Sequence, residues 1–341
     1  MRALILAAGF GKRLRPLTSV LPKPLAPVAG RPVVEHLLAR LPGEGIDCAV
    51  VNLHWLGEQL VERLEGGTAR GVEGRAARGQ AGGATRELPG GAAPGLELAW
   101  SREPRLLGTA GAIRGARGLL GDSDFMVLSG DGLHDVDLRA VVDRHRRSGA
   151  AATITVKRLS RPETCALVAL DEAGMVTRFV EKPPRHEIFT DLASIGIYCF
   201  SPAAADLIPT GPSSIARDLI PALLEHGMPI AAIETAAWWS DIGSLDELTA
   251  ANLAVLGGDV RTASPAQHTR LAGAQLYSGT HVDADAVLQG RVAAGPQALI
   301  GRKAHVHEAV VLPGAVVPGG TLVSGGMFGD PAAVAAAWRA R

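Results

Sequence analysis

The sequence predicts an α/β fold, in which a doubly wound, mostly parallel sheet is followed by a C-terminal left-handed parallel β-helix. Short apolar runs alternate with amphipathic segments over the first 256 residues, which is typical of a Rossmann-like sheet with helices on both faces. From Thr280 onward, small or apolar residues recur every six positions, the spacing of hexapeptide-repeat β-helices. The chain has 341 residues, 47% of them hydrophobic, and is long enough for two domains.

The elements of the first domain follow from apolar periodicity and from turn residues. Pro32 stands at a helix start, and Gly149 follows a helical pattern directly. Strands are predicted at 3–7, 47–52, 96–100, 125–129, 151–156, 166–170, 175–181 and 194–200. Helices are predicted at 31–41, 56–64, 109–120, 137–149, 213–227 and 244–258. The tetrapeptide DEAG at 171–174 predicts a hairpin turn.

Composition shifts and the repeat divide the chain into segments. A second apolar series follows the first two residues later, at Val282, Leu288, Ala294, Ile300, Val306 and Leu312. Between 66 and 95, Gly, Ala and Arg dominate without periodicity, so we expect a mobile surface insertion there. The predicted segments are a first domain at 1–256, a linker at 257–270, a β-helix at 271–326 and a tail or helix at 327–341.

Composition also excludes several classes of function. The formal net charge is zero, which disfavours a general binder of nucleic acid or of anionic membranes. Cys48, Cys165 and Cys199 form no CxxC pair, so we expect buried thiols in a reducing compartment and neither disulfide nor zinc site. Residues 9–15 interrupt any N-terminal apolar stretch, and no apolar run approaches a membrane-spanning length. We therefore expect a cytoplasmic protein.

The N-terminal stretch LILAAGFGKRLRPLT predicts an anion-binding loop. An apolar strand ends there in Gly9 and Gly11, and three cations, Lys12, Arg13 and Arg15, follow at once. Glycines let backbone N–H groups approach an anion closely, and adjacent cations neutralise it. No GxxxxGK[ST] is present, and a dinucleotide-type GxGxxG fails at Leu14. A polyphosphate is therefore favoured over NAD, the alternative being a solvated basic face.

The motifs taken together resemble one enzyme family. LAAGFGKRLRPLT followed by PKPLAPVAGRPVVEH is similar to the N-terminal signature of sugar-1-phosphate nucleotidyltransferases, also called NDP-sugar pyrophosphorylases. The later stretches VNLHWLGEQL, LGTAGAI, LSGDGLHDVDL, FVEKP, SIGIYCF and WWSDIGS resemble the later blocks of that family in the same order. The resemblance covers nearly the whole chain apart from the 65–95 insertion and the extreme C-terminus.

This resemblance implies a reaction and a set of roles. A sugar-1-phosphate oxygen attacks the α-phosphorus of a nucleoside triphosphate and releases pyrophosphate, and Arg13, Lys23 and Lys182 are the implied catalytic cations. The implied nucleotide-binding residues are Leu6, Ala8, Gly9, Gly11, Lys12, Arg13, Lys23, Gly108, Thr109 and Asp131. The implied sugar-phosphate-binding residues are Glu181, Lys182, Ser194 and Gly196. The phosphate nucleophile is already an anion at neutral pH, so no general base is needed.

The resemblance also implies a magnesium cofactor, and the repeat pattern itself predicts an assembly role for the β-helix. Asp131 follows a predicted central strand and Asp241 lies in WWSDIGS; both are implied Mg²⁺ ligands. Taken alone, Asp131 is a turn former in SGDG, and Asp241 is an acid at the N-terminus of the helix that begins at GSLDEL. The repeat domain carries no cluster of catalytic side chains, so we expect it to form a homo-oligomer.

The motif LGTAGAI is similar to the base-proximal segment of mannose-1-phosphate guanylyltransferases, which favours GTP and mannose 1-phosphate as substrates. Where relatives commonly show YGVV and NAGIY, this chain has CALV at 165–168 and SIGIY at 194–198. A thymidylyl-, uridylyl- or adenylyltransferase acting on another hexose 1-phosphate remains an alternative. So does a catalytically silent regulatory homologue that binds sugar nucleotides.

Overall fold

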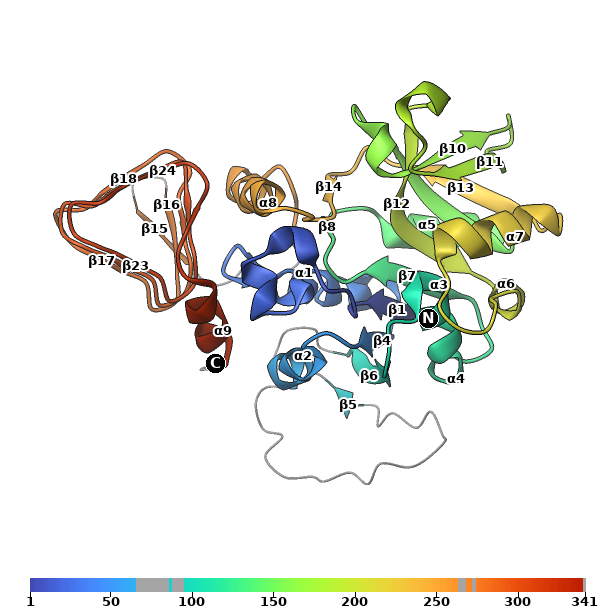
Figure 1. Ribbon diagram of the computed structural model, residues 1–341, viewed down its shortest axis with the longest axis horizontal. Helices are drawn as coiled ribbons and strands as arrows, with labels where there is room; N and C mark the ends of the chain where they lie inside the picture. The colour runs from blue at the N-terminus through green and yellow to red at the C-terminus, as the bar shows by residue number, and fades with distance from the viewer. Residues whose placement is uncertain (66–85, 88–94, 263–267, 272–273, 340–341) are drawn as a thin grey trace.

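The computed structural model describes residues 1–65, 86–87, 95–262, 268–271 and 274–339. Within these residues, ten strands form one mixed sheet, and a prism of short parallel strands projects from one end of the molecule (Figure 1). The predicted fold class is therefore confirmed. Most of the insertion expected at 66–95 lies outside the described residues. No helix in the described part of the chain is long and apolar enough to cross a membrane.

Four parallel strands form the first half of the sheet, in the order β6-β4-β1-β7. Their bounds are β1 (Arg2–Leu6), β4 (Cys48–Leu53), β6 (Glu97–Arg102) and β7 (Phe125–Ser129). The short strand β5 (Arg86–Glu87) pairs with β6. Ala3 and Ile5 face one hydrophobic cluster and Leu4 faces the other, so β1 is buried on both sides. Its continuous apolar sequence follows from that position.

The second half of the sheet is largely antiparallel. Its strands are β9 (Ala152–Arg158), β10 (Ala166–Leu170), β11 (Val176–Glu181), β12 (Leu192–Phe200) and β13 (Ile230–Glu234). One edge of β12 pairs with β10 through Ala193 and Ser194, and with β7 from Ile197 onward. Gly196 lies between the two partners with φ 76°, a conformation that glycine adopts without steric cost. The strand therefore changes partner at Gly196.

Helices cover both faces of the sheet. Their bounds are α1 (Val33–Leu38), α2 (Gly57–Leu64), α3 (Gly108–Gly115), α4 (Arg117–Leu120), α5 (Leu138–Ser148), α6 (Pro202–Asp206), α7 (Ile220–Glu225) and α8 (Leu245–Gly257). Two predicted helices are divided. The one at 109–120 breaks at Ala116, and the one at 213–227 begins with a π-helical segment (Ile215–Leu219). Gly149 ends α5 as the sequence predicts, and the Asp137 side chain caps its first turn.

Three parallel sheets form the sides of the C-terminal prism. One contains β16 (Ala274–Tyr277), β19 (Ala293–Ala294), β22 (Val310–Val311) and β25 (Met327–Phe328), with β15 (His268–Leu271) antiparallel at its edge. The second sheet contains β17 (His281–Val282), β20 (Leu299–Ile300) and β23 (Val316–Val317). The third contains β18 (Val287–Gln289), β21 (His305–His307) and β24 (Leu322–Ser324). This is the architecture of a parallel β-helix.

The repeat is not uniform. His281 pairs with Leu299, eighteen positions later, but Leu299 pairs with Val316, only seventeen positions later. The missing position lies at the corner after His307, where two residues replace the three that follow β18. Glu308 closes this tighter corner with φ 45°. The predicted six-residue register is therefore wrong beyond that corner, and Val311, not Leu312, aligns with Ala294.

The β-helix is joined to the first domain by a shared core. One hydrophobic cluster contains Val28, Leu248, Val292 and Val334, which belong to the first domain, α8, the β-helix and α9 (Pro331–Arg339) in turn. Helix α8 packs against β19 and β22, and α9 packs against α2. Figure 1 shows the C-terminal helix returning beside the N-terminal half of the sheet.

Candidate functional site

The strand order places a crevice at the carboxyl ends of β1 and β7. The chain leaves β1 toward β4 on one side, and β7 pairs with β1 on the other. Such a reversal of strand order opens a crevice between the loops that follow the two strands. Gly130 donates its N–H to the Leu6 carbonyl at 2.9 Å, and a Cβ at Gly130 would lie 3.0 Å from that oxygen. Asp131 is thereby brought beside the glycine loop.

The glycine loop is held from within. Gly11 has φ 59°, and a Cβ there would lie 2.9 Å from Thr18 Cγ2. The Thr18 hydroxyl donates to the Gly11 carbonyl at 2.7 Å, and the Trp55 indole N–H donates to the Thr18 carbonyl at 3.1 Å. Gly9 is exposed and has open space where a Cβ would stand. The loop therefore leaves backbone accessible at Gly9 and is fixed at Gly11.

Two ion pairs join the predicted cations to the predicted metal ligands. Lys23 Nζ lies 2.5 Å from Asp131 Oδ2 and donates to the Asp241 carbonyl at 2.8 Å. Arg13 Nη2 lies 3.5 Å from Asp241 Oδ2. The Ser129 hydroxyl donates to the second Asp131 oxygen at 2.6 Å. Residues far apart in the sequence thus form one cluster of alternating charge.

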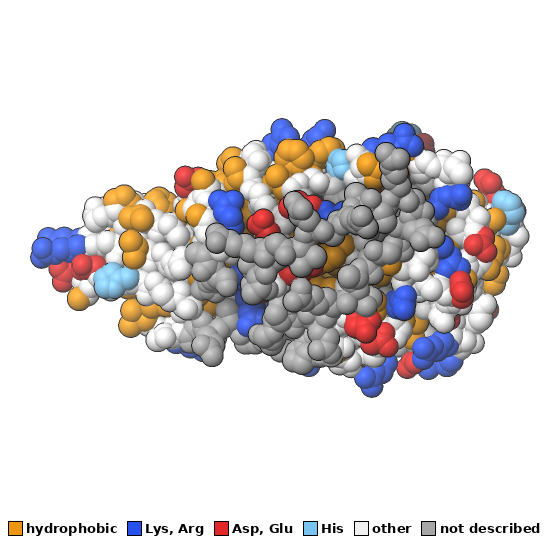
Figure 2. Space-filling view, turned by 90° about the horizontal axis from the view of Figure 1, so that it is seen from below, with side chains coloured by type: hydrophobic (Ala, Val, Ile, Leu, Met, Phe, Trp, Pro, Cys, Tyr) orange, Lys and Arg blue, Asp and Glu red, His pale blue; other side chains and the backbone are white. Residues whose placement is uncertain are grey.

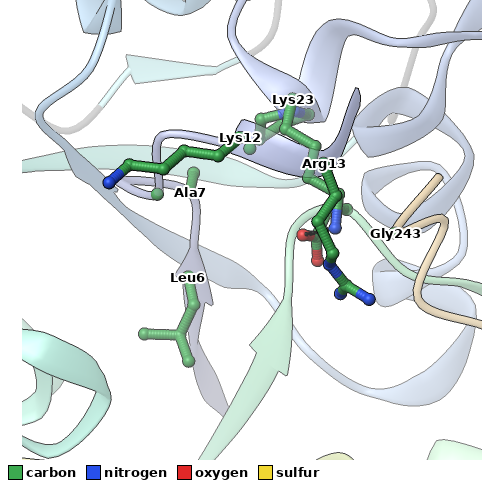
Figure 3. Close-up of a pocket in the computed structure, with 10 residues that line it drawn as sticks. Leu6, Ala7, Lys12, Arg13, Lys23 and Gly243 are labelled. Carbon is green, nitrogen blue, oxygen red and sulfur yellow. Dashed lines mark ion pairs between the residues drawn. The ribbon is translucent and has the colours of Figure 1, made fainter. Parts of the chain in front are cut away.

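This cluster borders a cavity of about 280 Å³ (Figure 3). Its lining comprises Leu6, Ala7, Gly9, Gly11, Lys12, Arg13, Lys23, Pro24, Asp131 and Gly243. Sequence reasoning missed Ala7, Pro24 and Gly243. A Cβ at Gly243 would lie 2.6 Å from Arg13 Nη2, so the guanidinium rests against the Gly243 backbone. Lys12 extends away from Arg13 and Lys23, and its Nζ lies 5.7 Å from the Phe10 ring centroid (Figure 3).

Three predicted nucleotide-binding residues do not line this cavity. Ala8 is buried below the loop, and its carbonyl accepts the Trp55 backbone N–H at 3.5 Å. Gly108 has φ 74° and packs against the Ser213 backbone, which a Cβ would approach to 2.4 Å. The Thr109 hydroxyl accepts the Ile215 N–H at 2.8 Å. The latter two residues thus hold α3 against the segment around Ser213.

A buried polar relay connects the glycine loop with the start of α3. The Ala7 N–H donates to Asn52 Oδ1 at 2.5 Å, and Asn52 Nδ2 donates to Glu103 Oε1 at 2.7 Å. The other oxygen of Glu103 accepts the Leu107 N–H at 3.0 Å. Asn52 and Glu103 are 3% and 5% exposed. Sequence reasoning missed both residues, although Asn52 ends a predicted strand on the same sheet edge as the loop.

The predicted sugar-phosphate residues lie on the antiparallel half of the sheet. Glu181 and Ser194 pair with Ala166 from its two sides, and Gly196 marks the change of partner along β12. Ser194 is buried and its hydroxyl donates to the Tyr198 oxygen at 3.1 Å. Lys182 is exposed, with its Nζ 3.6 Å from Glu181 Oε1. None of these four residues lines the 280 Å³ cavity.

Cys165 adjoins the predicted sugar-phosphate residues. Its carbonyl accepts the Lys182 N–H at 3.1 Å. Burial raises the pKa of the Cys165 thiol, the carboxylates of Asp241 and Glu181 raise it further, and Thr164 and Lys182 oppose them. Asp241 and Glu181, which come from the two groups of predicted site residues, are thus both near enough to Cys165 to act on its thiol. Burial also raises the pKa of Tyr198, to about 12, which keeps its phenol protonated.

Two residues beside the site have strained backbone. Lys182 has φ 46° and Ile242, directly after Asp241, has φ 44°. Side chains other than glycine rarely adopt such angles, and they persist where the surroundings fix them, often at ligand sites. One strained position is itself a predicted charged ligand, Lys182, and the other directly follows one, Asp241.

The donor set fits magnesium in its chemistry. Asp131 and Asp241 offer carboxylate oxygens, and Mg²⁺ is typically bound by one or two carboxylates with phosphate oxygens and waters. Both acids are already paired with cations that line the cavity, and Asp131 lines it as well. The described residues contain no group of three or more His, Cys, Asp or Glu side chains placed to hold an ion. Further ligands would come from substrate and water.

Comparison with known proteins decides the family. The sequence profile described as Nucleotidyl transferase matches residues 2–257. The chain belongs to this nucleotidyl transferase family. The resemblance to sugar-1-phosphate nucleotidyltransferases is thereby confirmed, and the cavity lies within the matched domain.

Relatives of this nucleotidyl transferase differ in base and sugar. A UTP–glucose-1-phosphate uridylyltransferase from Synechocystis is 32% identical over 275 residues, which cover 76% of this chain and 65% of the relative. The match thus spans about two thirds of that relative. A mannose-1-phosphate guanylyltransferase from Mycobacterium tuberculosis is 31% identical, covering 94% and 82%. A mannose-1-phosphate guanylyltransferase catalytic subunit beta from Drosophila pseudoobscura is 30% identical, covering 89% and 72%.

The fold of this nucleotidyl transferase also matches a solved structure. A protein from Bacillus anthracis, described as a candidate glucose-1-phosphate thymidylyltransferase, superimposes with a TM-score of 0.60. The match covers 76% of this chain and 96% of that protein at 22% identity. At that identity the likeness establishes the fold alone.

Proposed function

We propose that this protein condenses a nucleoside triphosphate with a sugar 1-phosphate to give an NDP-sugar and pyrophosphate. The observation that carries the proposal is a cavity lined by Arg13, Lys23 and Asp131 beside an open glycine loop, with Asp241 paired to Arg13 next to it. Backbone donors and two cations suit a triphosphate, and two carboxylates suit a divalent cation. Family membership supports the same reaction class.

The proposed chemistry needs alignment and charge neutralisation. A phosphate oxygen of the sugar 1-phosphate forms a bond to the α-phosphorus, and the bond from that phosphorus to the bridging oxygen breaks, so that pyrophosphate leaves with the electron pair. The nucleophile is already ionised, and the residues lining the cavity include no histidine that could act as a base. Lys23 would neutralise charge at the α-phosphate, Arg13 would bind the triphosphate, and Lys182 with Glu181 would hold the sugar phosphate.

Magnesium would be held by Asp131 and Asp241. When bound, it would supply positive charge that polarises the phosphate oxygens. In the free protein Lys23 occupies one Asp131 oxygen. A triphosphate that recruits Lys23 would free this carboxylate for the metal, so we expect the nucleotide and magnesium to promote each other's binding.

For the substrates we favour GTP and mannose 1-phosphate. The LGTAGAI motif and the two guanylyltransferase relatives support this choice. The uridylyltransferase relative and the CALV and SIGIY segments keep other bases and hexoses as alternatives. A panel of GTP, UTP, dTTP and ATP against several hexose 1-phosphates, measured by pyrophosphate release, tests the proposal. Release with GTP and mannose 1-phosphate is expected; no release with any pair would favour a silent homologue.

We also infer that the β-helix assembles two or more copies of this chain in the cytoplasm. On its outer faces Leu299 and Val316 are paired neighbours, 44% and 57% exposed, and Leu322 is 72% exposed. Figure 2 shows hydrophobic side chains at the narrow end of the molecule, which the β-helix forms. Replacing both Leu299 and Val316 by Ser should reduce the mass measured by light scattering, whereas Gln289→Ser should not. An unchanged mass would refute this interface.

A further inference from the structure

The segment that carries Lys23 is held by elements from the opposite end of the chain. Asn252 of α8 accepts the Ala29 N–H at 2.9 Å and donates to the Pro27 carbonyl at 3.0 Å. The Tyr277 ring of β16 lies against Gly30, where a Cβ would stand 2.4 Å from the ring. Asn252 and Tyr277 are almost fully buried. The residues between Lys23 and α1 thus rest on α8 and on the β-helix.

Of these C-terminal contacts, the one that Trp338 of α9 makes lies nearest to Lys23 along the chain. Lys23 begins the 3-10 turn η3 (Lys23–Leu25), and the Trp338 indole N–H donates to the Leu25 carbonyl at 3.0 Å. Trp338 is 4% exposed. From the same turn, Lys23 Nζ reaches Asp131 and the Asp241 carbonyl. The indole therefore holds one end of the turn whose other end carries the ammonium group.

A largely buried ion pair holds the Trp338 indole in place. The Arg63 guanidinium carbon of α2 lies 5.0 Å from the Trp338 ring centroid, a cation–π geometry. Arg63 Nε donates to Glu35 Oε1 of α1 at 2.7 Å, and the two side chains are 14% and 8% exposed. Arg63 and Glu35 thus fasten the ring from the first domain, and its N–H is directed at the Leu25 carbonyl.

We propose that Trp338 is a positioning residue for the triphosphate site, acting through its hydrogen bond to the turn that carries Lys23. A helix that supplies no reacting group would thereby set the place of the charge that acts on the α-phosphate. The inference rests on the proposed function for the role of Lys23. The contact itself is independent of that role. Plain packing of a large ring is the competing explanation, and it does not require the N–H.

The test compares two tryptophan-to-phenylalanine substitutions. Trp338→Phe keeps a ring against Arg63 and removes the donor to Leu25. Trp100→Phe is the matched control, because Trp100 Nε1 donates to Glu65 Oε1 at 2.8 Å in another part of the sheet. We expect Trp338→Phe to lower kcat by about three- to tenfold, which corresponds to the net free energy of one hydrogen bond. The KM for the sugar phosphate should not change. Trp100→Phe should leave kcat within about twofold.

A readout independent of catalysis accompanies the kinetics. Hydrogen–deuterium exchange of amides 23–33 should be faster in Trp338→Phe than in wild type and unchanged in Trp100→Phe. Val334→Ala, which loosens the packing of α9 without removing a donor, separates packing from hydrogen bonding; Val334 is fully buried. Equal losses of kcat in Val334→Ala and Trp338→Phe would overturn the proposal. Unchanged kcat and exchange in Trp338→Phe would also overturn it.

The two proposals fail in different ways. If Lys23→Ala retained full turnover while Trp338→Phe still accelerated exchange at 23–33, the assigned role of Lys23 would fall and the positioning contact would stand. If Lys23→Ala were inactive and Trp338→Phe behaved as wild type in both measurements, the proposed function would stand and the positioning role would fall.

Discussion

The two ends of the candidate site differ in how far the free protein assembles them. At the end where we propose that the triphosphate binds, the side chains of Lys23 and Asp131 are 12% and 22% exposed and 2.5 Å apart, and they border a formed cavity. At the proposed sugar-phosphate end, the Lys182 side chain is 58% exposed. Its Nζ lies 3.6 Å from Oε1 of the adjacent residue, Glu181. At the first end the Lys23–Asp131 pair is fixed, although Arg13 is itself 72% exposed, whereas at the second end the lysine side chain extends into solvent.

This difference indicates how each end should respond to substitution. A charge that is held in place and partly desolvated interacts strongly with charge that develops in a transition state, because little reorganisation is needed. An exposed lysine must first be ordered by its ligand, and water screens its charge until then. We therefore expect the triphosphate end to affect turnover and the sugar-phosphate end to affect binding.

The largest effect is expected at Lys23. Lys23→Ala removes a fixed charge from the proposed α-phosphate position and leaves Asp131 without its ion-pair partner. We therefore expect kcat to fall about 10²- to 10³-fold, the cost of one oriented electrostatic contact. Steady-state pyrophosphate release measures this change. Arg144→Ala is the control, because Arg144 also donates to backbone carbonyls, at Ala173 and Ala232, remote from the cavity. A loss smaller than tenfold would remove Lys23 from the catalytic role.

A smaller and different effect is expected at Lys182. Lys182→Ala should raise the KM for the sugar 1-phosphate about tenfold or more and change the KM for the triphosphate little, since an oriented ion pair to phosphate is lost only at that end. Titrating each substrate separately measures the split. Arg185→Ala removes a nearby cation that is 83% exposed and serves as the control. Weakened triphosphate binding with unchanged sugar-phosphate binding would reverse the placement of the two ends.

The same contrast explains which parts of the site could be predicted from sequence. Gly9, Gly11 and Arg13 follow β1 directly, and Asp131 follows β7, so strand order alone brings them together. Their grouping is a consequence of local pattern and parallel pairing. The fold class was predictable for the same reason, because strands and helices alternate in the sequence.

The supporting contacts could not be predicted in this way. Asn52 meets Ala7 across 45 positions, and Trp338 meets Leu25 across 313. No spacing rule relates residues so far apart; only the packed structure does. The β-helix corner at Glu308 is a further case. Its carboxylate accepts the Arg291 N–H at 2.7 Å above Gly290, a backbone arrangement that the six-residue period does not encode.

The smallest effect is expected at Lys12, which the sequence places beside Arg13 and the structure separates from it. The Lys12 ammonium lies 5.7 Å from the Phe10 ring centroid and points away from Arg13, whereas Arg13 pairs with Asp241 and rests on Gly243 (Figure 3). Both side chains are exposed, but Arg13 is held by its ion pair, whereas the Lys12 ammonium has to be ordered by the triphosphate before its charge acts unscreened. Lys12→Ala should therefore change kcat/KM for the triphosphate by less than about threefold, and Arg13→Ala by more than about tenfold. Repeating both measurements at 0.5 M salt sharpens the test, because the Debye length falls to about 4 Å and should abolish the Lys12 effect alone. A loss at Lys12 equal to that at Arg13 and insensitive to salt would show that both cations contact the triphosphate directly.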